Sequence, residues 1–161
     1  MTGITIEESA LAEGLSAADV ARALQAALAS GALMRDGGSG LLYCSEDVGS
    51  VHVFAGFAGG GAGGGQALVR EAYLSRSRPH GAPEEPRRTR GSGPPELFGL
   101  DERELTCLRD GARMAVRIFT FAYLKTTYKA PGLYCPACGQ YFVSKEIAQM
   151  QGRIETTLEW K

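Results

Sequence analysis

The chain has 161 residues, 44% of them apolar, and its 17 basic residues nearly balance its 18 acidic ones. A chain of this length can bury one core or two very small ones. No apolar run approaches the roughly 20 residues that span a bilayer, and the N-terminus lacks the basic-then-apolar pattern of a signal peptide. We therefore expect no membrane partner and a cytoplasmic location.

Residues 1–55 are predicted to form a small lobe of two helices followed by a hairpin. The apolar spacing from Thr5 to Gly14 predicts a short first helix. Ser16 opens a capping-box pattern, which predicts a second helix that ends near Ser30. Residues 33–43 then have the pattern of two short strands joined by an Asp-Gly-Gly turn.

Two helices and a hairpin in this order resemble the later part of a winged-helix domain, which implies a DNA-binding regulator. The charge of this segment argues against that function, because residues 1–50 carry seven acidic groups and two basic ones. Duplex binding draws most of its affinity from Lys and Arg side chains that neutralise phosphates. We therefore expect a helical cap or dimerisation module, with nucleic acid as a disfavoured partner.

Residues 56–94 are predicted to be a flexible linker that is rich in Gly, Pro and Arg. Seven of the ten residues from Gly56 to Gly65 are glycine, and no Lys-Ser or Lys-Thr pair follows them as in a phosphate-binding loop. Residues 66–93 add six arginines and three prolines, which disfavour long regular structure. The alternative is a basic arm that docks on an acidic partner or nucleic acid.

Cys135-Pro-Ala-Cys138-Gly139 has the metal-binding form of a CxxC motif. A tight turn aims both sulfurs at one point, and Gly139 permits the positive φ that such a turn needs. A thiol-exchange CxxC belongs at the start of a helix, where the helix dipole lowers the thiol pKa, whereas an extended segment follows here. We therefore favour metal binding over redox exchange.

Cys107-Leu-Arg-Asp110-Gly111 has the same form, with Asp110 in the place of the second cysteine. The spacing between the two motifs is that of a zinc ribbon, in which the intervening strands bring two such turns face to face. Zinc accepts carboxylate oxygen as well as thiolate sulfur, so four residues can close a tetrahedral site. They are Cys107, Asp110, Cys135 and Cys138, with zinc as the expected metal and iron as the second choice.

The rest of residues 95–161 is predicted to complete this zinc-ribbon-like module. Residues 113–124 are rich in β-branched and aromatic residues, which favours strands, and Ala130-Pro-Gly predicts a turn. Ser144 is placed to cap a final helix that extends to Leu158. The predicted fold class is α+β, with a helical and hairpin lobe, a flexible middle and a ribbon with a terminal helix.

The segment from Cys107 to Lys161 resembles small double-CxxC proteins, assigned a redox role, that are encoded beside maturation genes for xanthine-dehydrogenase-like molybdenum hydroxylases. The likeness rests on the Cys-Pro-x-Cys-Gly motif, the apolar strand after it and the closing Glu155-Thr-Thr-Leu-Glu-Trp-Lys161. It implies that Cys107, Cys135 and Cys138 are metal ligands and that the partner belongs to a molybdenum-hydroxylase system. Asp110 departs from the family pattern, so Cys44 or His52 is kept as an alternative fourth ligand.

The sequence leaves three functions open. The first is a non-enzymatic metal-binding accessory or subunit protein that contacts a protein partner in a larger complex. The second is a thiol redox protein, in which Cys135 and Cys138 hold no metal and form a dithiol or a disulfide. The third is a winged-helix transcriptional regulator. With only two histidines in the chain, a Ser-His-Asp or Cys-His catalytic set is poorly supported.

Overall fold

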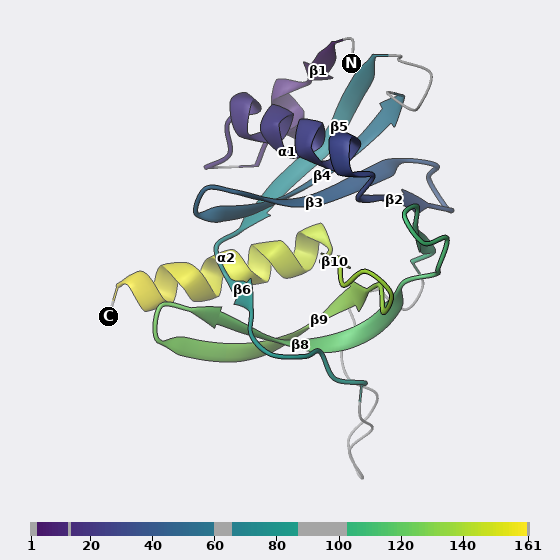
Figure 1. Cartoon of the computed structure of the whole chain (residues 1–161). Coiled ribbons are helices and arrows are strands. Elements are labelled where there is room, and N and C mark those ends of the chain that lie inside the picture. The colour runs from purple at the N-terminus through teal and green to yellow at the C-terminus, as the bar shows by residue number, and fades with distance from the viewer. Residues whose placement is uncertain (1–2, 13, 60–65, 87–102, 161) are drawn as a thin grey trace.

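The computed structural model describes residues 3–12, 14–59, 66–86 and 103–160. In these residues the chain is mostly β, with two sheets and two α-helices (Figure 1). The helix α1 (Ala17–Ser30) covers one face of the larger sheet. The helix α2 (Lys145–Glu159) and the smaller sheet both lie on the opposite face of the larger sheet. None of the helices in these ranges is long and apolar enough to cross a bilayer.

The large sheet has six strands, which lie in the order β1, β5, β4, β3, β2 and β7. The strands β1 and β5 are parallel, and the other neighbours are antiparallel. In the same order across the sheet, the bounds are Ile4–Ile6, Ala67–Ser75, Val51–Gly59, Leu42–Val48, Leu33–Asp36 and Leu105–Cys107.

The small sheet has four antiparallel strands in the order β10, β9, β8 and β6. Their bounds are Tyr141–Phe142, Thr126–Tyr134, Ala115–Tyr123 and Arg78–Pro79. The turn that we predicted at residues 130–132 is wrong, because β9 continues through these residues. The chain reverses at Leu124, which has a positive φ of 54° and directly follows β8.

The predicted α+β class, with a helical lobe and a separate zinc ribbon, is wrong. The described residues from Thr5 to Gly14 do not form the α-helix that we predicted: β1 pairs with β5, and a short 3-10 helix, η1 (Glu8–Ala10), follows it. The strand β7 pairs with β2, so the C-terminal part contributes the sixth strand of a sheet that the N-terminal part builds. Long-range strand pairing overrides the local apolar spacing on which the prediction depended.

The predicted flexible middle is also corrected, because β5 and β6 lie within residues 56–94. The strand β5 pairs with β4 along its whole length and buries Ala67, Val69 and Ala72. The register shifts between Gly56 and Phe57, so that Arg70 of β5 has no partner on β4. Residues 60–65 and 87–94 of the predicted linker lie outside the described residues.

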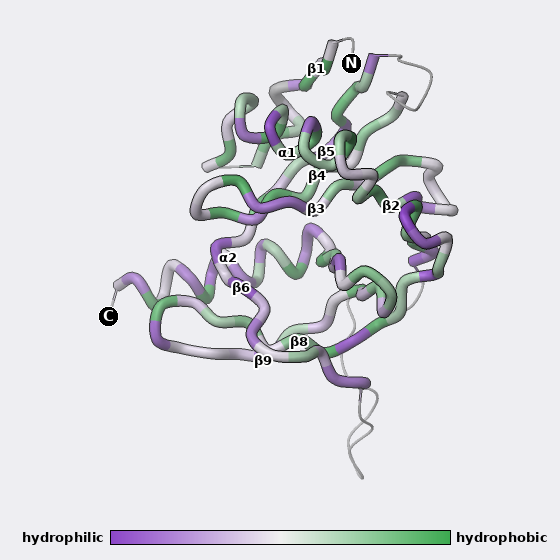
Figure 2. The backbone as a smooth tube through the Cα atoms, viewed as in Figure 1, coloured by the Kyte–Doolittle hydropathy of each residue, from purple (hydrophilic) through white to green (hydrophobic). Residues whose placement is uncertain are grey.

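The two predicted helices that begin at serine caps are confirmed. The Asp19 N–H donates to Ser16 Oγ at 3.1 Å, and α1 ends at Gly31 in the left-handed conformation. The Ile147 N–H donates to Ser144 Oγ at 3.4 Å at the start of α2. Hydrophilic and hydrophobic residues alternate around α2 (Figure 2), as expected for a helix with one buried face.

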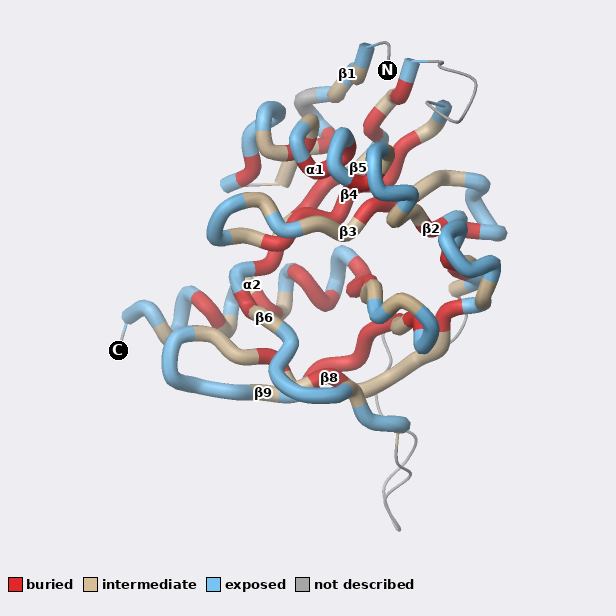
Figure 3. Tube along the Cα trace, viewed as in Figure 1, coloured by how far each residue is buried: buried red, intermediate tan, exposed pale blue. Residues whose placement is uncertain are grey.

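Two buried clusters lie on opposite faces of the large sheet (Figure 3). The first packs α1 against the sheet, with Leu24 of the helix and Phe57 of β4 both fully buried. The second fills the space between the large sheet, the small sheet and α2. It includes both Cys107 and Cys135, so the candidate site lies at the margin of this second core.

Candidate metal centre

A tight turn follows β7 and carries two of the predicted ligands. The Gly111 N–H donates to the Cys107 carbonyl at 2.8 Å, and the Cys107 N–H donates to the Ala112 carbonyl at 2.8 Å. Gly111 has a φ of 72°, a conformation that favours glycine. This backbone places the Asp110 carboxylate beside the Cys107 thiol, with Sγ and Oδ2 3.4 Å apart.

A second turn with the same hydrogen bonds follows β9. The Gly139 N–H donates to the Cys135 carbonyl at 2.9 Å, and the Cys135 N–H donates to the Gln140 carbonyl at 3.0 Å. Gly139 has a φ of 82°. Because both turns share these two bonds and the same glycine position, Asp110 holds the place in the first turn that Cys138 holds in the second.

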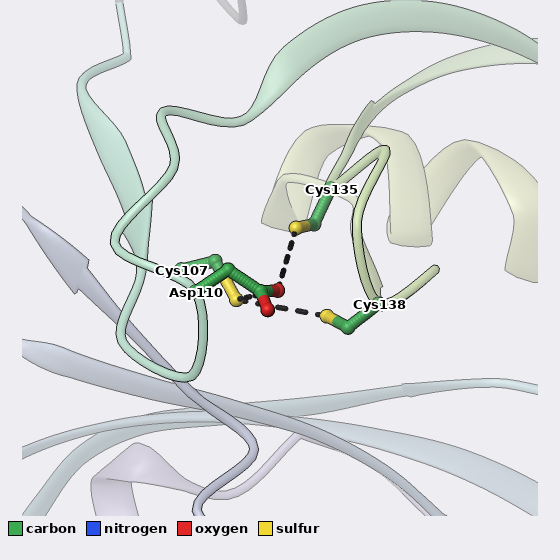
Figure 4. Close-up of side chains that lie close together, drawn as sticks. All are labelled: Cys107, Asp110, Cys135 and Cys138. Atoms are coloured by element: carbon green, nitrogen blue, oxygen red, sulfur yellow. Dashed lines mark hydrogen bonds between the residues drawn. The ribbon is translucent and has the colours of Figure 1, made fainter.

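The two turns belong to different sheets and meet where the sheets meet. Cys107 pairs with Met34 at the edge of the large sheet, and the next N–H, of Leu108, donates to the Leu33 carbonyl at 2.9 Å. Cys135 directly follows β9 of the small sheet. Strand pairing in two separate sheets therefore fixes the approach of the turns, and the side chains converge from both (Figure 4).

The geometry of the four side chains suits a single metal ion. One ligand atom from each of Cys107, Asp110, Cys135 and Cys138 lies within 4.8 Å of all the others. The Cys107 and Cys138 sulfurs are 3.6 Å apart, and Cys135 Sγ lies 3.3 Å from Asp110 Oδ2. Two sulfurs on a tetrahedral zinc lie about 3.8 Å apart when each bond is about 2.3 Å. The cluster therefore needs only small adjustments to hold the ion.

Burial and hydrogen bonding favour the protonated form of the Cys138 thiol beside the carboxylate. Burial raises the pKa of the Cys138 thiol, and hydrogen bonds with Cys107, Cys135 and Asp110 raise it further. Hydrogen bonds from the thiols of Cys135 and Cys138 lower the pKa of Asp110. A metal ion that binds here must displace the thiol protons, so its binding depends on pH.

The Gln140 side chain supports the site from outside the predicted ligand set. Its amide Nε2 donates to Cys107 Sγ at 2.9 Å and lies 3.5 Å from the Leu33 carbonyl. Gln140 thus follows the second turn but stabilises the cysteine of the first. Our sequence reasoning missed this role, since the only signal is a polar residue directly after the Cys-x-x-Cys-Gly motif.

The two alternative ligands lie elsewhere in the structure. Cys44 is fully buried in the cluster beneath α1, where burial raises the pKa of its thiol to about 12. His52 takes part in a separate hydrogen-bonded group on β3 and β4. Neither residue belongs to the group of potential ligands around Cys107.

A Ser-His-Asp chain of hydrogen bonds, which the sequence reasoning did not find, connects Ser45, His52 and Asp47. Ser45 Oγ lies 2.6 Å from His52 Nε2, and Asp47 Oδ1 lies 2.7 Å from His52 Nδ1. Asp47 and His52 lie together because they are direct partners across β3 and β4. The imidazole is 8% exposed and stacks on Tyr141 with ring centroids 4.7 Å apart. We interpret the chain as the polar support of a buried histidine.

A groove with a volume of about 1180 Å³ lies between α2 and β5. Its walls include Arg76, Lys145 and Arg153. None of the residues that line it belongs to the candidate metal centre or to the histidine network.

Residues 103–161 match a family described as a domain of unknown function, DUF7479. The matched segment extends from the residues before β7 to the C-terminus and contains all four candidate ligands. No curated protein and no solved structure matches the chain.

Proposed function

We propose that Cys107, Asp110, Cys135 and Cys138 bind one zinc ion that fastens the two sheets together. The convergence of the four ligand atoms within 4.8 Å carries this proposal. Three thiolates favour a borderline or soft metal over magnesium or calcium, and zinc also accepts the single carboxylate. Iron is the second choice of metal for this donor set.

The ion acts in a non-enzymatic accessory or subunit protein that works through protein contacts. The turns around the site present apolar residues to solvent: Leu108 is 39% exposed, and Pro136 and Ala137 are exposed as well. At the end of α2, Trp160 is 86% exposed. The resemblance of residues 107–161 to the small double-CxxC proteins supports a partner from a molybdenum-hydroxylase system. Co-expression with subunits of such an enzyme tests this partner, because we expect a stable complex to form.

Metal analysis of the purified chain tests the site. We expect about one zinc ion per chain, and loss of that ion in Cys135→Ser and Cys138→Ser. Cys44→Ser is the matched control, because Cys44 is as deeply buried as Cys135 but lies outside the cluster. Purified wild-type protein that holds neither zinc nor iron, and takes up neither when it is added under reducing conditions, would reject the proposal.

A thiol redox function of Cys135 and Cys138 is less well supported by the site. A reactive thiol needs a lowered pKa, whereas burial raises the pKa of Cys138. The Cys135 side chain is fully buried. Thiol titration of oxidised and reduced samples separates the two functions, since a metal site predicts metal-protected thiols and a redox pair predicts reversible loss of two thiols.

A further inference from the structure

The four ligand positions differ in their access to solvent. Cys107 and Cys135 are fully buried and Cys138 is partly buried, whereas Asp110 is exposed. The residues on either side of Asp110 in the first turn, Arg109 and Gly111, are exposed too. A metal ion at the centre of the cluster would therefore be shielded by Cys107 and Cys135 and approachable from the side of Asp110.

The hydrogen bonds that hold the ligand side chains in place also differ between Cys107 and Asp110. Cys107 Sγ accepts a hydrogen bond from Gln140, which would remain after the thiol loses its proton. The hydrogen bonds that Asp110 makes within the described residues come from the thiols of the cluster itself. Metal binding removes those thiol protons, so the ion alone would then hold the carboxylate.

We propose that Asp110 is a displaceable ligand and that the bound ion accepts an external thiolate in its place. This inference rests on the proposed metal site. Zinc sites with three strong protein ligands commonly use the fourth position for an exchangeable group, and sulfur suits zinc better than a lone carboxylate oxygen. The metal–oxygen bond to Asp110 breaks, a metal–sulfur bond forms and the proton of the thiol passes to solvent. No electron is transferred.

The surroundings of this position suit a thiol that belongs to a small molecule or to a protein. Leu108, Pro136 and Ala137 make an exposed apolar rim on the two turns. Arg109, the neighbour of Asp110, donates from its Nη2 to the Ser30 carbonyl at 3.0 Å. A thiolate that approaches between the turns can reach Asp110, which is exposed, whereas Cys107 and Cys135 are fully buried.

Spectroscopy of the cobalt-substituted protein tests the inference. Co²⁺ occupies sites of this kind, and its sulfur charge-transfer absorption increases with the number of bound thiolates. Wild type, Asp110→Ala and Asp110→Cys are loaded with Co²⁺ and titrated with 2-mercaptoethanol. We expect the absorption of wild type and Asp110→Ala to rise by about a third as a fourth thiolate joins three. Both spectra should approach that of Asp110→Cys, which should not change.

The outcomes separate this inference from the metal site itself. A wild-type protein that binds Co²⁺ but does not respond to thiol, while Asp110→Ala does respond, would show that Asp110 is a fixed ligand and overturn the inference. A wild-type protein that binds no Co²⁺ would overturn the metal site, and the inference with it. A parallel titration with an unstructured single-cysteine peptide identifies the source: a response to 2-mercaptoethanol alone indicates a small thiol, and a tighter response to the peptide indicates a protein cysteine.

Discussion

The Gln140 side-chain amide donates to Cys107 Sγ at 2.9 Å, so a residue of one turn supports the cysteine of the other. An N–H donor stabilises a thiolate more than a thiol, because the acceptor carries the charge. This contact also links the small sheet, through β10, to the edge of the large sheet. It therefore links the position of the second turn to that of the first.

Replacement of Gln140 by Ala should weaken metal binding roughly 10–100-fold, as is typical when an outer partner of a ligand is removed. Competition with a chromophoric zinc chelator measures the change. Gln149→Ala is the matched control, because Gln149 is exposed on α2 and lies outside the site. Equal zinc affinity in the two variants would contradict a supporting role for Gln140.

Metal removal should lower the thermal stability of the chain. The ion would join a turn after β7 to a turn after β9, and those strands belong to different sheets. A ligand that binds only the folded state stabilises it by about 4 kcal/mol at about 1,000 times its Kd. Thermal unfolding with zinc and with excess EDTA measures the difference. Cys138→Ser should unfold at the same temperature in both, and an unchanged wild-type Tm would argue against a structural ion.

The parts of the fold that sequence analysis predicted correctly are those with local signals. Ser16 and Ser144 cap helices through hydrogen bonds to residues three positions away. The two turns are also local, since each depends on a glycine four positions after a cysteine. For this reason the sequence pattern predicted that Cys107 and Cys135 belong to equivalent motifs.

The sheet order could not be predicted in the same way, because it depends on partners far apart in the chain. Cys107 pairs with Met34, and Ile4 pairs with Ala67. Neither pair has a composition or spacing that marks it. The glycine and arginine content of residues 56–94 further obscured β5, whose buried residues alternate imperfectly. The support of Cys107 by Gln140 was hidden for the same reason, because it crosses between sheets.

Glu155 should be the carboxylate on α2 that contributes most to stability. It is 1% exposed, and its Oε1 accepts from the N–H groups of Arg76 and Ser77, both at 2.9 Å, and from Ser77 Oγ at 2.8 Å. Glu155→Ala would remove the acceptor that the Arg76 and Ser77 N–H groups and the buried Ser77 hydroxyl share, so we expect a loss of about 3 kcal/mol. Denaturant unfolding of the variant measures this loss.

Two further variants make that measurement specific. Glu155→Gln keeps a carbonyl acceptor at the same place and should therefore lose less than Glu155→Ala. Glu159→Ala removes a carboxylate one turn later on the exposed side of α2, together with its exposed hydrogen bond from the Tyr123 hydroxyl, and we expect a change below about 0.5 kcal/mol. A loss for Glu159→Ala as large as that for Glu155→Ala would show that the buried acceptor is not what distinguishes Glu155.

His52 should make the folded state less stable as the pH falls. Burial lowers its pKa below the ordinary value of 6.5, against the opposing hydrogen bond to Asp47 and with a smaller lowering by Arg78. Below pH 6.5 the unfolded chain takes up a proton that the folded chain does not, so stability is full above this pH and is lost towards the lower folded pKa. Unfolding of the metal-free chain at a series of pH values measures this slope without metal release. His52→Gln should remove the part of the dependence of stability on pH that begins near pH 6.5. If wild type and variant show the same dependence, the imidazole has the same pKa in the folded and the unfolded chain.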